Sequence, residues 1–169
     1  MAWGDKQMSD NLNSERHEKD HSIAHLNSGR RSTDRVVKIW EDATDKKTIP
    51  GVLDSTLWDN CFLLAMDEVI DCCVIIDHGE KAGAGLNLSN QHSKNLRNLP
   101  PRLRDLIFTL GQKCIKDRSP CSYSQESNIS EEIPAKQYRL AVVPLLPANE
   151  RDRGSTYQVT SVLGVFTYH

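Results

Sequence analysis

The chain has 169 residues, a formal net charge of -2 and a hydrophobic content of 38%. This length suits one domain with a tail, and the mixed charges disfavour a protein built to neutralise nucleic-acid phosphates. The low hydrophobic content indicates that part of the chain stays unfolded.

The five cysteines have no regular spacing, so they do not indicate a disulfide framework, and three of them lie within apolar runs as reduced core thiols do. The first thirty residues contain no apolar leader segment, and no run of eighteen apolar residues occurs. We therefore expect a soluble cytoplasmic protein that binds neither nucleic acid nor a membrane.

Residues 1–31 are polar, highly charged and poor in β-branched and aromatic side chains. Such a segment buries too little apolar surface to offset the entropy of ordering, which predicts a disordered tail or a helix that forms only against a partner. Within it, His17-Glu18-Lys19-Asp20-His21 spells H-E-x-x-H, a zinc-binding pattern on a helix. The polar flanks favour a solvated tail over a metalloprotease. Adventitious metal binding by these two histidines and His25 is the second interpretation, ahead of the metalloprotease.

The predicted domain spans residues 32–169 and begins with an amphipathic helix over 32–45, which Ser32 or Thr33 can cap. Spacings of three and four place an apolar stripe on one side of this helix, made of Val36, Ile39, Trp40 and Ala43.

Two strands are predicted next, over 61–66 and 69–76, with the acidic pair Asp67-Glu68 between them as a tight hairpin turn. The glycine-containing stretch 77–99 is predicted to form short helical turns.

A second long helix is predicted over 102–116, opened by Pro101, because its apolar residues recur at helical spacing. Three more strands are predicted over 121–127, 137–146 and 156–168. This order predicts an α+β domain. It consists of a five-stranded antiparallel sheet with helices on one face, together with the N-terminal amphipathic helix.

The element order resembles the PAS fold, in which short helices and one longer helix interrupt five antiparallel strands after the second. More narrowly, the chain resembles the stand-alone PAS-like proteins common in alphaproteobacteria. The residues that carry this likeness are Trp40, Pro50, Asp54, Tyr138, Arg139, Pro144 and Leu145. It departs from their pattern at Gly51-Val52 and at Asp77-His78-Gly79.

The resemblance implies a non-catalytic sensory or signalling module that binds a small ligand between helices and sheet, or a partner protein. The expected pocket residues are Phe62, Leu64, Val74, Ile76, His92, Leu106, Leu110, Tyr138, Leu140, Val142, Leu163 and Val165. A shift of one residue in any strand would reverse its faces.

A module without an output domain has to signal through contacts, so we expect a homodimer or a signalling partner. The candidate contact residues are Val36, Val37 and Trp40 on the first helix, whose alternative role is packing on their own sheet.

Other chemistry receives weaker support from the residue pattern. Cys72-Cys73 suggests a redox sensor or a flavin attachment, but an inert core cysteine explains it better. His78 or His92 could ligate haem, although the long helix has no histidine. The alternative function is a small-molecule enzyme using these two histidines with Tyr138 and Arg139, or a metal-binding protein. No cofactor follows from the sequence.

Overall fold

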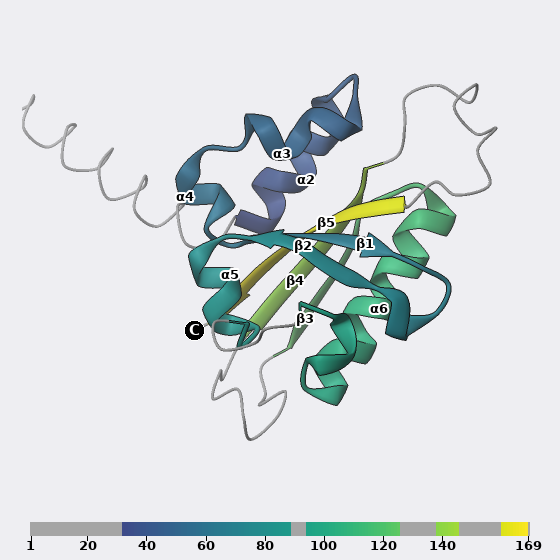
Figure 1. The fold of residues 1–169 in the computed structure, drawn as a ribbon. Coiled ribbons are helices and arrows are strands. Elements are labelled where there is room, and N and C mark those ends of the chain that lie inside the picture. The colour runs from purple at the N-terminus through teal and green to yellow at the C-terminus, as the bar shows by residue number, and fades with distance from the viewer. Residues whose placement is uncertain (1–31, 89–93, 126–137, 146–159, 169) are drawn as a thin grey trace, which may run out of the picture. The chain divides into compact units, whose positions relative to one another are not determined.

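One antiparallel sheet of five strands organises the computed structural model, which describes residues 32–88, 94–125, 138–145 and 160–168 (Figure 1). The strands lie in the order β2-β1-β5-β4-β3, so the last strand of the chain pairs with both the first and the fourth. Their bounds are β1 Cys61–Met66, β2 Val74–His78, β3 Cys121–Gln125, β4 Tyr138–Pro144 and β5 Thr160–Tyr168. Helices pack on this sheet, which confirms the predicted α+β, PAS-like architecture.

The helical elements precede β1 or lie between β2 and β3, apart from one turn before β2. Those before β1 are α2 Ser32–Asp42, η1 Lys46–Thr48, α3 Ile49–Val52 and α4 Ser55–Trp58. Those that follow are η2 Ile70–Cys72, α5 Glu80–Gly85, η3 Leu96–Asn98 and α6 Pro101–Asp117. In the described parts of the chain, no helix has the length and hydropathy of a membrane span.

Both long helices begin where the sequence predicts. α6 has a proline in its first turn and ends at Asp117, where it is capped by Arg118, whose left-handed backbone (φ 52°) directs its N–H to the carbonyls of Cys114 and Ile115. α2 ends at Asp42 instead of the predicted residue 45. The reason is local, because the Asp45 carboxylate accepts the N–H of Lys47 at 3.0 Å and so caps η1.

The predicted two-residue hairpin turn at Asp67-Glu68 is wrong. A longer connection containing η2 joins β1 to β2, and β2 starts only at Val74. Asp67 stabilises this connection at its start, since its carboxylate accepts the N–H of Val69 at 2.9 Å. Its own N–H points to the sulfur of Cys73 at 3.3 Å. A tight turn would need a residue tolerant of positive φ, and the acidic pair offers no glycine.

Two apolar clusters hold the domain together, one on each face of the sheet. We call the side of α5 and α6 the inner face and the side of α2 the outer face (Figure 1). The inner cluster is the larger, and its fully buried members include Phe62, Leu86, Leu103, Ile107 and Phe166. Each such side chain contributes about 1.5–3 kcal/mol of burial energy. The predicted tail over 1–31 lies outside the described residues.

Candidate functional site

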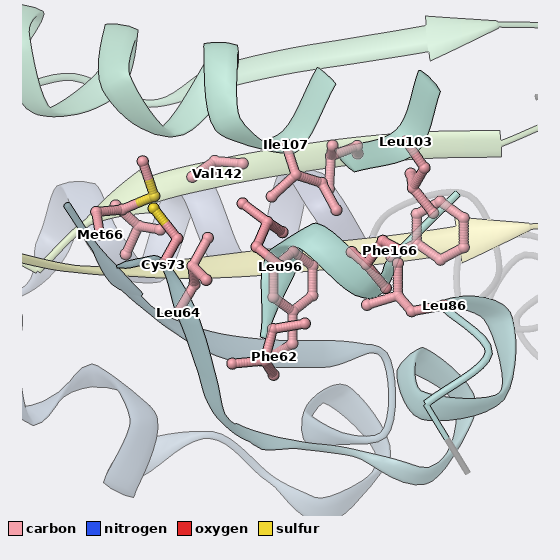
Figure 2. Packing of buried hydrophobic residues seen from close by; sticks show 14 of the residues in the cluster. Phe62, Leu64, Met66, Cys73, Leu86, Leu96, Leu103, Ile107, Val142 and Phe166 are labelled. Atoms are coloured by element: carbon pink, nitrogen blue, oxygen red, sulfur yellow. The ribbon is translucent and has the colours of Figure 1, made fainter. Parts of the chain in front are cut away.

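The predicted pocket residues divide between the two faces of the sheet. Phe62 and Leu64 of β1 and Tyr138, Leu140 and Val142 of β4 lie together on the inner face, as predicted. They pack with residues of α6, and Figure 2 shows Phe62, Leu64 and Val142 among their neighbours. Their burial agrees with the strand alternation on which the prediction depended.

The predicted inward face of β2 is displaced by one residue. Val74 and Ile76 are exposed, at 41% and 49%, whereas Ile75 between them is 1% exposed and packs in the inner cluster. Ile75 of β2 pairs with Leu64 of β1, and the register of the two strands shifts between Leu63 and Leu64. The late start of β2 after η2 and this shift explain the error, because a one-residue change reverses the faces of a strand.

The prediction for β5 is also reversed. Leu163 and Val165 belong to the outer cluster, while Val162 and Phe166 take the inner positions. Residues 162–166 are all buried, so the strand is apolar on both sides. Alternation of apolar and polar residues therefore carried no information about its faces.

On α6 the predicted residues flank the contact instead of forming it. Leu103, Ile107 and Cys114 are fully buried, whereas Leu106 and Leu110 are partly buried at the side of the inner cluster. His92, the remaining predicted pocket residue, lies outside the described residues.

Side chains occupy the space between α6 and the sheet. Gly164 of β5 shows how closely, because a Cβ there would lie 2.1 Å from the ring of Phe62. Likewise a Cβ at Gly111 of α6 would lie 2.9 Å from the sulfur and methyl carbon of Met66. Burial raises the pKa of the Cys114 thiol to about 12, so this thiol is neutral and no nucleophile near pH 7.

The polar residues considered for catalysis do not converge. Tyr138 is buried on the inner face, while its neighbour Arg139 is exposed and lines a hollow of the outer face. His78 packs its ring against Gly83 of α5, with Nδ1 3.0 Å from the carbonyl of Gly79. In the described parts of the chain, no cluster of three or more His, Cys, Asp or Glu side chains could hold a metal ion. The H-E-x-x-H segment lies outside them.

The vicinal cysteines differ in environment. Cys73 is fully buried in the inner cluster and Cys72 is exposed, which agrees with the expectation that at most one faces the core. Desolvation by burial raises the pKa of Cys73.

The first helix packs on its own sheet. Val36 of α2 is fully buried in the outer cluster, and Val37 and Trp40 pack beside it. The indole N–H of Trp40 donates to the carbonyl of Pro144 at 2.7 Å. The ammonium of Lys46 lies 4.3 Å from the centre of the indole ring and donates to the carbonyl of Trp40. The fully buried Val36 is thus used within the domain, and the partly buried Val37 and Trp40 contribute to the same packing.

An open groove lies on the outer face between α2 and the edge strand β3. Its larger hollow, of about 520 Å³, is lined by Thr33, Asp34, Val37, Lys38 and Glu41 of α2, by Pro120, Cys121 and Ser122, and by Ala141 of β4. A smaller hollow of about 230 Å³ shares Thr33, Asp34 and Ser122 and adds Tyr123, Ser124, Arg139 and Leu140. We call these two hollows the α2–β3 groove.

Sequence reasoning did not find this groove. Asp34 and Glu41 read simply as the polar side of an amphipathic helix, and Ser122 and Ser124 as strand residues. The available signal was the alternation of small polar residues in β3, which is typical of a strand with one open face. Neither a known protein-family model nor a curated protein matches the sequence.

Proposed function

We propose that residues 32–169 form a non-catalytic, PAS-like signalling module that acts through contacts with another protein and not through a small molecule held under α6. The observation that carries this proposal is the contrast between the filled inner face and the open outer groove. A sensor pocket needs a cavity lined by apolar side chains and a few converging polar groups. Among the residues that the structure describes, fully buried rings and aliphatic chains occupy the inner face, among them Phe62, Leu103 and Ile107.

The residues that carry the resemblance to PAS-like proteins support a module of this kind by their placement. Trp40 and Pro144 are 104 positions apart and are joined by the indole hydrogen bond. Asp54 caps α4 and pairs with Arg35 of α2 at 3.0 Å. These residues position the helix that borders the groove, so their role is to shape a contact surface.

Native mass spectrometry of the purified full chain tests the proposal. The expected result is the mass of the polypeptide alone, or of its assemblies, after exchange into ammonium acetate. A small molecule that remains bound at one per chain and is released on denaturation would overturn it. A homodimer, if present, would need a surface other than the buried side of α2.

A further inference from the structure

The two edges of the sheet differ in how their backbone groups are used. At β2, the N–H of Ile75 donates to the carbonyl of Lys94 at 2.8 Å, and the N–H of Leu96 donates to the carbonyl of Cys73 at 3.0 Å. The segment before η3 therefore covers that edge. At β3, the ladder with β4 accounts for every backbone hydrogen bond made to another described segment, so no described segment pairs with the far side of this strand.

β3 lacks the charges, the proline and the bulge that commonly block pairing with a further strand. Its sequence, Cys-Ser-Tyr-Ser-Gln, contains no charge and no proline, and its register with β4 runs through all five residues without a bulge. Native edge strands usually carry lysine, proline or a bulge to prevent association. Their absence from β3 favours an edge that accepts a strand.

The α2–β3 groove runs beside this edge of the sheet. Ser122 pairs with Ala141 and Ser124 with Arg139, and these residues line the groove on the outer face. In an added strand, alternate side chains would face the same way. Side chains two residues apart would thus reach the larger and the smaller hollow in turn, which is how strand addition obtains specificity.

The charges of the larger hollow define the side chain that it suits. Asp34 and Glu41 contribute carboxylates, and neither forms an ion pair with another described residue. The ammonium of Lys38 is paired with Asp42 at 3.0 Å. Val37 and Ala141 provide apolar surface beneath. A long basic side chain fits both parts, since its stem covers apolar surface while its head meets a carboxylate.

We propose that β3 binds an extended segment of a partner protein as a sixth strand, with an arginine or lysine of that segment in the larger hollow of the α2–β3 groove. A second copy of β3 fits less well. Its side chains on the outer face would be Ser122 and Ser124, which are too short to fill the hollow and carry no charge for Asp34 and Glu41. The inference rests on the proposed function and specifies the surface and the class of partner.

The test uses the full chain labelled with nitrogen-15 and a blocked peptide, acetyl-Thr-Val-Thr-Arg-Thr-Val-Thr-amide. Titration to millimolar peptide is followed by amide chemical shifts. We expect saturable shifts at Ser122, Tyr123 and Ser124 and along α2, with the matched peptide carrying glutamate at the centre binding about threefold or more weakly. In an added strand, only every second amide N–H faces β3. N-methylation of that set of alternate peptide amides should abolish binding, whereas N-methylation of the other set should not.

A charge variant and its matched control identify the hollow. Asp34→Asn with Glu41→Gln should remove the preference for arginine over glutamate, whereas Glu68→Gln with Glu80→Gln removes two exposed carboxylates elsewhere and should preserve it. Absence of shifts, shifts centred on β2, or equal affinity for both peptides would overturn the proposal. Concentration-dependent shifts at β3 without peptide would overturn the assigned partner in favour of a second copy. The proposed function would be contradicted by a co-purified small molecule. None of the outcomes above depends on such a molecule, so the two proposals can fail separately.

Discussion

The inner and outer faces of the sheet are stabilised in different ways. The inner face is a broad apolar layer in which buried side chains from β1, β2, β4, β5, η3 and α6 pack together. The outer face has a smaller apolar cluster beneath α2 and adds directional contacts, above all the Trp40 hydrogen bond and the Lys46 cation over its ring. The difference indicates that the inner face determines stability, whereas the outer face determines where α2 lies and hence the shape of the groove.

The largest expected effect is the truncation of an inner aromatic ring. Phe62→Ala should lower the free energy of unfolding by about 3–5 kcal/mol, because the ring is fully buried and packs against Gly164. Urea denaturation followed by circular dichroism measures the change. Ile76→Ala is the control on exposed β2 surface and should cost at most about 0.5 kcal/mol. Equal losses for the two variants would contradict the assignment of faces.

The second prediction asks whether the outer layer opens separately. Trp40→Ala should lower stability by about 2 kcal/mol, less than a fully buried ring, because Trp40 is only partly buried. Two buried thiols report on the two faces, Cys61 in the outer cluster and Cys114 in the inner one. The rate of alkylation of Cys61 should increase about 30-fold, the factor that corresponds to about 2 kcal/mol. The rate of alkylation of Cys114 should increase less.

A conservative variant separates the ring of Trp40 from its hydrogen bond. Trp40→Phe keeps aromatic packing and leaves the carbonyl of Pro144 without the indole donor, which should cost about 1 kcal/mol. If the two thiols in Trp40→Ala accelerate by the same factor, the faces unfold together and the comparison between them fails.

The fold could be predicted well from the sequence because two kinds of local signal mark its elements. These are the periodic spacing of apolar residues and residues with a fixed backbone preference, such as proline. The helical spacing in α6 and its first-turn proline led to bounds within about one residue of those observed. The predicted faces of β1 and β4 are also correct, because Phe62, Leu64 and Val142 lie inward.

The rest could not be predicted because the decisive information is not local. β5 is apolar on both faces, so only its pairing with β1 and β4 determines that Val162 faces inward and Leu163 outward. The shift in β2 depends on a connection held by Asp67 and Cys73 that no short pattern encodes. The groove exists because α2 and β3, far apart in sequence, border the same open surface.

The third prediction uses the buried thiols as a pH probe. Burial raises the pKa of Cys61 and of Cys114 from 9.0 to about 12. In the unfolded chain both thiols ionise near pH 9, while the folded protein keeps them protonated, so stability is lost as pH rises above 9 toward 12. At pH 10 the loss is about 1.4 kcal/mol for each thiol relative to pH 7.5.

Single-thiol variants assign this loss to each face. Urea midpoints at pH 7.5 and pH 10 should show that Cys61→Ala and Cys114→Ala each remove a similar part of the pH effect, with Cys72→Ala as the matched control for removing an exposed thiol. The remainder comes from Cys73, Cys121 and Tyr138, whose pKa values burial also raises. A pH effect that both single variants leave intact would show that neither thiol is buried as described.

The smallest expected effect concerns Asp54, which connects α4 to α2. One carboxylate oxygen accepts the N–H of Leu57 at 2.8 Å and the other pairs with Arg35 at 3.0 Å. Both side chains of the ion pair are about half exposed, so the helix cap should dominate. Asp54→Ala should then cost about 1 kcal/mol, whereas Asp54→Asn, an equally good cap, should cost little. If the asparagine variant loses as much as alanine, and the loss disappears in 1 M salt, charge and not capping holds α2 against the sheet.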